Sequence, residues 1–156
     1  MNRRALLSRV SALVGLSAAG LPALAEDTFE VSKTEEEWRA ILSPAAFAVL
    51  READTETSGS SPLDHQVGAG TYFCAGCDLA LYSSEQKFDS GTGWPSFWDP
   101  LPDAVRTQSD WGLLGKRTEV HCRRCGGHLG HVFNDGPKPT GKRYCMNGVA
   151  MVFRAA

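Results

Sequence analysis

The residues of this sequence with the most evident chemistry are its five cysteines, and their spacing divides them into two groups. Four form two C-x-x-C pairs, CAGC at residues 74–77 and CRRC at residues 122–125, and the fifth, Cys145, stands apart. A C-x-x-C turn directs two thiolates at one point, so two such turns can complete a tetrahedral site of four sulfurs. The pattern predicts one structural Zn(II) ion per chain, held by Cys74, Cys77, Cys122 and Cys125.

Two other interpretations of the paired cysteines remain open. Four thiols in an oxidising compartment can form disulfides, and a lone C-x-x-C can be the redox pair of a thiol–disulfide oxidoreductase. The redox interpretation is the weaker one because neither pair precedes a helix in a βαβ unit. Metal analysis that found no zinc, together with four thiols consumed in disulfides, would contradict the zinc prediction.

Cys145 lies in KRYCMNG (142–148), which we expect to form a β-strand. Successive side chains of a strand alternate between its faces, so Arg143, Cys145 and Asn147 should project together. A nearby guanidinium lowers the pKa of a cysteine and favours the nucleophilic thiolate. A buried, inert thiol is the other interpretation, since free cysteine is among the residue types most often buried. The flanking cation and amide favour a nucleophile.

His128 and His131 are the candidate proton donors, because the ordinary pKa of histidine, about 6.5, permits proton transfer at neutral pH. They are three residues apart, so a regular strand would place them on opposite faces. A β-bulge at Gly130 would bring both to one side. Either can instead be a structural histidine. Asp135 is assigned to the following turn, with at most an indirect part in the chemistry.

A third group of candidate residues is aromatic and lies in FDSGTGWPSFWDP (88–100). Two glycines predict a bent and exposed loop, beside which Trp94, Phe97 and Trp98 are crowded together. An aromatic wall near a thiol can hold a methyl or thioether group. Core packing is the alternative role, and we expect it for at least one of the three.

Short strands and two helices must position these residues. Thr34 with Glu37 forms a capping-box pattern, and Ser43-Pro44 predicts the start of a second helix. From Thr71 onward, seven short β-prone stretches alternate with turn-forming residues. This pattern is typical of a mainly β fold, an antiparallel sandwich or barrel, rather than of βαβ units. TETSGSSPLDH (55–65) reads as a loop without an evident role.

Residues 1–25 have the features of an export signal. They combine a basic start, an apolar stretch and Ala23-Leu24-Ala25, an A-x-A cleavage pattern. The apolar stretch is shorter than the roughly 18 to 20 residues that a membrane span requires. We expect cleavage to leave a mature domain of residues 26–156 without stable membrane insertion; a membrane tether formed by the uncleaved segment is the alternative.

The adjacent Arg3 and Arg4 suggest the twin-arginine route, which exports folded proteins to the bacterial periplasm. Zinc could then be bound in the cytoplasm before export. Cleavage would remove three arginines and change the formal net charge from −2 to −5. A mildly acidic domain without basic runs argues against nucleic acid or an anionic membrane as a partner. A chain of 156 residues suits one globular domain, which we expect to be a monomer.

Together these segments resemble the B-type methionine sulfoxide reductases, which reduce the R epimer of methionine sulfoxide. The resemblance extends from about Trp38 to Phe153. It is carried, in order, by CAGC, KFDSGTGWPSF, CRRCGGHLGHVFNDGP and RYCMNG. It implies a fold of two antiparallel β-sheets with short helices, and a zinc ion on the four paired cysteines.

The resemblance also implies roles for the site residues, with oxidised methionine in peptides or proteins as the substrate. Cys145 would be the nucleophile and would become a sulfenic acid. Trp94 would bind the methyl group, with Phe97 assigned to the same substrate-binding wall. The pocket and its proton donor would be organised by His128, His131 and Asn147, with Arg143 beside the thiol. We prefer His131 to His128 as the donor, and a protonated Cys145 remains a further possibility.

One position departs from the family pattern. Many members have a recycling cysteine at the third position of SGxGW, where this sequence has Thr92. With four thiols committed to zinc, no thiol of the chain remains to form a disulfide with Cys145. The sulfenic acid must then be resolved by an external thiol, such as a thioredoxin-like protein or a small thiol. A zinc-ribbon binding module with an inert Cys145 is the alternative function class.

Overall fold

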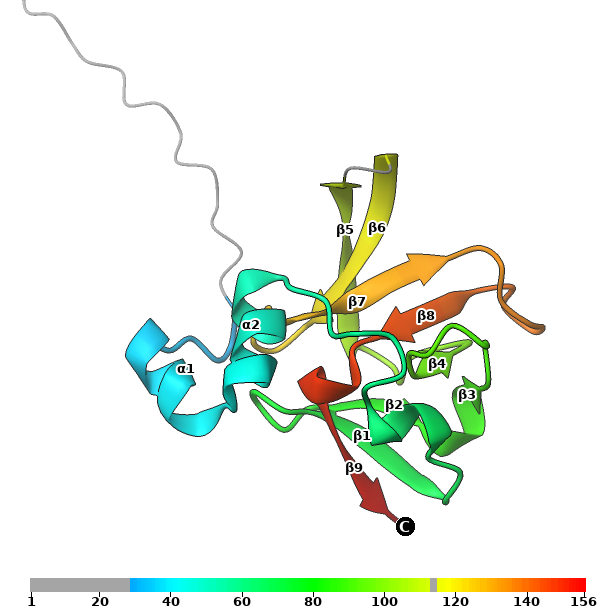
Figure 1. Ribbon diagram of the computed structural model, residues 1–156, viewed down its shortest axis with the longest axis horizontal. Coiled ribbons are helices and arrows are strands. Elements are labelled where there is room, and N and C mark those ends of the chain that lie inside the picture. The colour runs from blue at the N-terminus through cyan, green and yellow to red at the C-terminus, as the bar shows by residue number, and fades with distance from the viewer. Residues whose placement is uncertain (1–28, 113–114) are drawn as a thin grey trace, which may run out of the picture.

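The computed structural model describes residues 29–112 and 115–156, so the expected signal segment, residues 1–25, lies outside the described part. Within that part, two helices precede a series of short strands (Figure 1). The helices are α1 (Glu35–Ile41) and α2 (Pro44–Glu52), with three 3-10 helices, η1 (Pro62–His65), η2 (Ser84–Gln86) and η3 (Gly148–Ala150). The strands are β1 (Gly70–Cys74), β2 (Ala80–Ser83), β3 (Lys87–Phe88), β4 (Ser96–Phe97), β5 (Val105–Gly112), β6 (Gly115–Cys122), β7 (His128–Phe133), β8 (Arg143–Met146) and β9 (Met151–Ala155).

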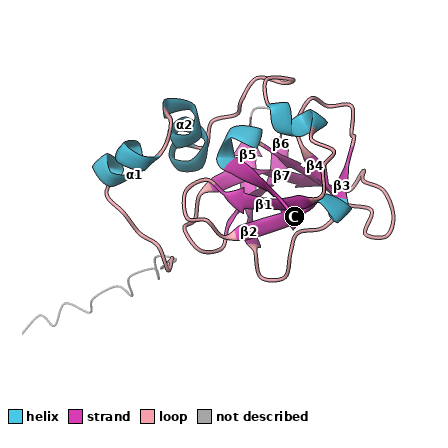
Figure 2. Ribbon diagram, turned by 90° about the horizontal axis from the view of Figure 1, so that it is seen from below, coloured by secondary structure: helices cyan, strands magenta, loops and turns pink. Residues whose placement is uncertain are grey.

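The strands form two antiparallel sheets. The smaller sheet has the order β2-β1-β9, and the larger has the order β3-β4-β8-β7-β6-β5. Both helices lie together at one end of the molecule, beside the sheets (Figures 1 and 2). This architecture confirms the predicted mainly β fold with two antiparallel sheets and short N-terminal helices. No helix in residues 29–112 or 115–156 is long and apolar enough to cross a bilayer.

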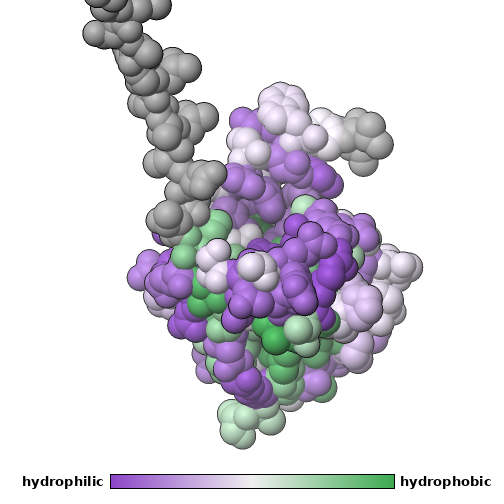
Figure 3. All heavy atoms as spheres, turned by 90° about the vertical axis from the view of Figure 1, so that its left-hand side faces the viewer, coloured by the Kyte–Doolittle hydropathy of each residue, from purple (hydrophilic) through white to green (hydrophobic). Residues whose placement is uncertain are grey.

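The two helices begin where their capping residues predict. Thr34 and Glu37 form the reciprocal capping box, in which the Glu37 N–H donates to Thr34 Oγ1 at 3.2 Å. Ser43 Oγ accepts from the N–H of Ala46 at 3.2 Å, and Pro44 is the first residue of α2. The surface on this side of the molecule is largely hydrophilic, with smaller apolar areas between the polar ones (Figure 3). Each helix therefore turns a polar face outward while α2 buries an apolar face against the core.

The core joins the two sheets through three aromatic rings. Phe97 of β4, with 0% of its surface exposed, stacks on Tyr82 of β2 with ring centroids 4.3 Å apart. Tyr72 of β1 meets the same ring edge-on at 4.9 Å. Ser96 pairs with Cys145 and Phe97 with Tyr144, so the two neighbours in β4 point to opposite faces of the larger sheet. Phe97 consequently packs between the sheets rather than on the face that carries Cys145.

Replacing this ring should destabilise the whole domain. We expect Phe97→Ala to lower the free energy of unfolding by about 3–5 kcal/mol, because the cavity left behind is enclosed by both sheets. Urea unfolding followed by circular dichroism measures the change. Ile41→Ala, at a side chain that is 55% exposed, is the control and should stay within about 0.5 kcal/mol of the parent. A loss below about 1 kcal/mol for Phe97→Ala would contradict this account of the core.

Candidate active site and metal centre

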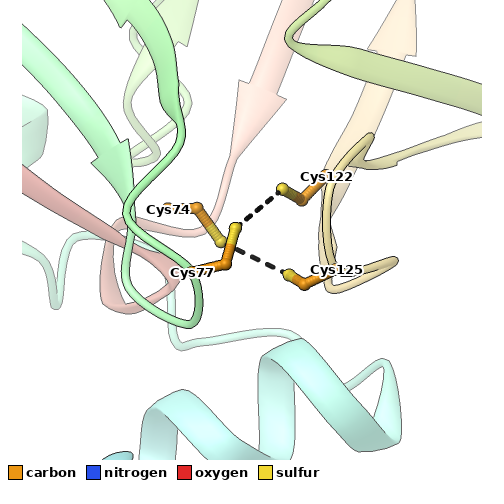
Figure 4. Close-up of side chains that lie close together, drawn as sticks. All are labelled: Cys74, Cys77, Cys122 and Cys125. Carbon is orange, nitrogen blue, oxygen red and sulfur yellow. Dashed lines mark hydrogen bonds between the residues drawn. The ribbon is translucent and has the colours of Figure 1, made fainter. Parts of the chain in front are cut away.

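The four paired cysteines meet at one point, with Cys74 and Cys77 on one turn and Cys122 and Cys125 on the other (Figure 4). The four Sγ atoms all lie within 4.8 Å of one another. Two of the separations are 3.7 Å (Cys74 to Cys125) and 3.5 Å (Cys77 to Cys122). A tetrahedron with Zn–S bonds of about 2.3 Å has edges of about 3.8 Å, whereas a disulfide bond is about 2.05 Å. All five cysteines are free, and the cluster of four could hold a metal ion.

The turn that carries Cys122 and Cys125 is fixed by its own backbone and by α2. The N–H of Cys122 donates to the carbonyl of Gly127 at 2.9 Å, and Gly126 adopts a φ of +67°, which glycine tolerates without strain. The Arg51 guanidinium of α2 donates two hydrogen bonds to the Cys125 carbonyl, at 3.1 and 3.2 Å. The helical end of the molecule is thereby tied to the metal centre.

The polar residues of the site lie on one face of the larger sheet, next to one another across the strands. Cys145 of β8 pairs with Ser96 of β4 on one side and with His131 of β7 on the other. Glu119 of β6 is the next partner of His131. Directly opposed residues of antiparallel strands point to the same face. The row Ser96–Cys145–His131–Glu119 is the framework of the candidate active site.

A cavity of about 160 Å³ opens beside Cys145 on this face. It is lined by Thr55, Trp94, Arg117, Gly130, His131, Phe133, Cys145 and Asn147. It contains the predicted nucleophile, the predicted proton donor His131, the predicted substrate-binding residue Trp94, and Asn147, predicted to organise the pocket. It shares no residue with the cysteine cluster, so a metal ion there would be separate from the cavity.

The two histidines come to the same side through an irregularity in β7. Val120 pairs with Gly130, and the next residue, His121, pairs with His128, so one extra residue of β7 interrupts the register. The rings of His128 and His131 lie with centroids 5.3 Å apart. The bulge that the sequence predicts at Gly130 is therefore present. Of the two histidines, His131 lines the cavity, whereas His128 is buried and does not.

Each histidine is hydrogen-bonded to a carboxylate from the β5–β6 pair. His128 Nδ1 lies 2.7 Å from Glu119 Oε1, and His131 Nε2 lies 2.8 Å from Asp110 Oδ2. Asp110 also accepts from Arg117 at 2.6 Å. Burial lowers the pKa of His131 and the hydrogen bond to Asp110 only partly opposes it, so the imidazole is mainly neutral at neutral pH.

Cys145 is half-buried beside a hydroxyl and a cation. Thr92 Oγ1 lies 3.9 Å from its Sγ. The Arg143 guanidinium makes two 2.9 Å hydrogen bonds to the carboxylate of Asp135. Burial raises the pKa of Cys145, while the Thr92 hydrogen bond and the charge of Arg143 lower it without overcoming burial. The effect expected of Arg143 is present but is outweighed, so the resting residue is a thiol.

The remaining site residues divide between the cavity wall and the core. The indole N–H of Trp94 donates to the carbonyl of Glu56 at 3.1 Å, and Asn147, which is buried, donates from Nδ2 to the carbonyl of Leu129 at 3.0 Å. Phe97, assigned to the substrate-binding wall from the sequence, lies in the core and does not line the cavity. Trp98 does not line the cavity either.

Several residues of the site are not identified by sequence reasoning. They are Thr55, Glu56, Asp110, Arg117, Glu119 and Phe133. The alternation in KRTEV places Arg117 and Glu119 on one face of a strand, which is the one local signal for them. Their partners are set by the register of the sheet, which this alternation does not specify.

Comparison with known proteins agrees with this geometry. Residues 42–155 match the family model described as the SelR domain. A peptide methionine sulfoxide reductase MsrB of Methanosarcina barkeri is 51% identical over 125 residues, covering 80% of this chain and 88% of the relative. One of Bradyrhizobium diazoefficiens is 53% identical, covering 78% and 88%. Peptide methionine sulfoxide reductase B7 of Arabidopsis thaliana is 44% identical over 146 residues, covering 92% and 97%.

The family match covers the metal cluster, the aromatic segment and the strand of Cys145 in one continuous region. The similarity to these relatives extends over most of this chain and most of theirs. With its two antiparallel sheets, its four-cysteine cluster and its thiol-containing cavity, the chain belongs to the SelR-domain family of B-type methionine sulfoxide reductases.

Proposed function

We propose that this protein reduces methionine-R-sulfoxide in peptides or proteins to methionine, with Cys145 as the nucleophile, and thereby repairs oxidised methionine. The observation that carries the proposal is the cavity that combines the Cys145 thiol, the Trp94 indole and the carboxylate-bound imidazole of His131. An indole holds a methyl or thioether group by dispersion. The thiol and the imidazole, on paired residues of adjacent strands, supply the nucleophile and the proton carrier.

The resting protonation states suggest the order of proton transfers. Cys145 begins as a thiol and His131 mainly as a neutral imidazole, so the imidazole first accepts the thiol proton. Cys145 Sγ then attacks the electrophilic sulfoxide sulfur and forms an S–S bond, while imidazolium protonates the sulfoxide oxygen. The hydroxyl group moves from the substrate sulfur to Sγ as the S–O and S–S bonds break, which leaves methionine and an S–OH group on Cys145. The sulfoxide sulfur gains two electrons and Cys145 loses two, so methionine and a sulfenic acid form in balance.

The metal centre has a separate role in the proposal. The four cysteine thiolates would hold Zn(II), and because they fill all four positions of a tetrahedron, none is left for water or substrate. A bound ion would supply folding free energy by joining the β1–β2 turn to the β6–β7 turn.

Resolution of the sulfenic acid depends on a thiol from outside the chain. Of the five cysteines of the sequence, four lie in the metal cluster. Thr92 occupies the position at which many family members have a recycling cysteine, and its hydroxyl cannot form a disulfide with Cys145. A thioredoxin-like protein or a small thiol is the proposed reductant.

Replacing the nucleophile tests the function directly. We expect Cys145→Ser to lower the reduction of a methionine-R-sulfoxide peptide by at least about a thousandfold with dithiothreitol, because a neutral hydroxyl does not attack the sulfoxide. A chromatographic assay of both sulfoxide epimers measures it, with the S epimer as the inactive control. The melting temperature and metal content should not change. Retained activity in Cys145→Ser would eliminate the proposal in favour of a binding module.

Metal removal tests the zinc site. We expect one zinc per chain, and we expect Cys77→Ser to lower the melting temperature by about 10 °C or more, since metal binding is coupled to folding. Elemental analysis and calorimetry measure the two quantities. Cys145→Ser, which leaves all four ligands in place, is the matched control and should retain zinc. A native protein without zinc, with its four paired cysteines in disulfides, would refute the assignment.

Trapping the oxidised enzyme tests how it is resolved. After one turnover without reductant, we expect Cys145 as a sulfenic acid that reacts with dimedone, and no disulfide within the chain. Thr92→Cys should form a disulfide with Cys145, because it places sulfur where Oγ1 now lies 3.9 Å from Sγ. Ser109→Cys, on exposed β5, is the control and should form none. Non-reducing peptide maps that join Cys145 to a metal-cluster cysteine in the native protein would disprove external resolution.

A further inference from the structure

The loop between α2 and η1, for which the sequence suggests no role, contacts the segment that carries Trp94. Ser58 Oγ donates to the carbonyl of Thr92 at 2.8 Å, and the N–H of Gly59 donates to the carbonyl of Gly93 at 2.7 Å. Gly93 has a φ of +83°, and a Cβ there would collide with Ser58. The two backbones are thus in direct contact, and the loop holds the bent segment ahead of Trp94 from outside.

Glu56 of this loop is hydrogen-bonded to Trp94, to Asn147 and to the turn after Cys145. Its carbonyl accepts the indole N–H of Trp94 at 3.1 Å, and its N–H donates to Asn147 Oδ1 at 3.0 Å. Its carboxylate accepts the N–H groups of Gly148 at 2.6 Å and Val149 at 3.0 Å. One residue therefore binds the aromatic wall of the cavity and the turn that follows Cys145.

The carboxylate replaces a missing cap. Asn147 stands at the N-cap position of η3, but its side chain makes no capping hydrogen bond. The N–H groups of Gly148 and Val149, which have no acceptor within η3, are instead bound by the Glu56 carboxylate. The Asn147 side chain does not cap η3 and makes other hydrogen bonds instead.

The same contacts fix the orientation of the Asn147 amide. Its Oδ1 accepts from the Glu56 N–H, and its Nδ2 donates to the Leu129 carbonyl. An amide nitrogen has two hydrogens, so one remains after the bond to Leu129. Asn147 lines the cavity, where a donor hydrogen can bind the oxygen of a sulfoxide.

We infer that Glu56 is a positioning residue of the active site: its carboxylate locks the loop to the turn after Cys145, and its main chain then holds Trp94 and Asn147 in their binding geometry. The kinetic part of this inference rests on the proposed function, whereas the structural part does not. The carboxylate itself contacts backbone amides, so Glu56 acts through the two other side chains.

Kinetics with a methionine-R-sulfoxide peptide test the inference. We expect Glu56→Ala to raise KM about tenfold and to lower kcat by less than about threefold, because the main-chain carbonyl that accepts the Trp94 indole N–H is no longer held in place by the carboxylate. The KM of Glu56→Gln should lie between those of the native protein and Glu56→Ala. Its carboxamide has one acceptor oxygen and would turn a donor toward the second N–H. Alkylation of Cys145 by iodoacetamide needs neither Trp94 nor Asn147. Its rate in the Glu56 variants should therefore stay within about twofold of the native rate. Glu36→Ala, at an exposed carboxylate of α1, is the matched control and should behave as the native protein.

A measurement independent of activity is the indole N–H resonance of Trp94 in a ¹H–¹⁵N NMR spectrum, assigned with Trp94→Phe. In Glu56→Ala it should shift, and its hydrogen exchange should accelerate at least about tenfold, while Glu36→Ala leaves both unchanged. If Glu56→Ala does not fold, Glu56→Gln and Ser58→Ala provide the same comparison.

The outcomes distinguish a failure of the Glu56 inference from a failure of the proposed function. An unchanged indole signal, or an unchanged KM in a folded Glu56 variant, overturns the inference. A native protein that does not reduce the sulfoxide removes the proposed function, and the indole signal alone then decides whether Glu56 positions Trp94.

Discussion

The register of β8 between β4 and β7 is the constraint on which the candidate site depends. It places Cys145 directly opposite Ser96 on one side and His131 on the other. Because side chains alternate along a strand, a shift by one residue would turn Cys145 into the core and bring Tyr144 to the cavity. The burial of Met146 and of Phe97 on the opposite face opposes such a shift, so the hydrophobic core also determines where the thiol points.

The four-cysteine cluster and the cavity lie in separate parts of the molecule and share no residue. The cluster joins the end of β1 to the end of β6, and Arg51 extends that connection to α2. The cavity, on one face of the larger sheet, receives residues from β6, β7 and β8 and from the loops that carry Thr55 and Trp94. A metal ion held by the four cysteines would thereby stabilise the sheet without lying in the cavity.

Burial sets the resting protonation state of Cys145 and His131. It raises the pKa of Cys145 and lowers that of His131, and in each residue it outweighs the nearby opposing charge. A thiol beside a neutral imidazole has no net charge, which is the less costly arrangement in a partly dry cavity. In the proposed reaction the charged pair would form only when the polar sulfoxide is bound, so proton transfer would be coupled to substrate binding.

Local patterns in the sequence predicted the two helix starts, the mainly β class, the four-cysteine cluster and the bulge that brings His128 toward His131. Each depends on residues close together in the chain or on the spacing of like residues. Other features depend on partners far apart in the chain: Asp110 with His131, Glu56 with Trp94 and Asn147, and the burial that outweighs Arg143. Phe97 belongs with them, because the side of β4 that faces the core is fixed by pairing with β8. The sequence by itself therefore determined which side chains can react, and the tertiary structure decided how they are held and protonated, since sheet register and desolvation arise only when distant segments pack together.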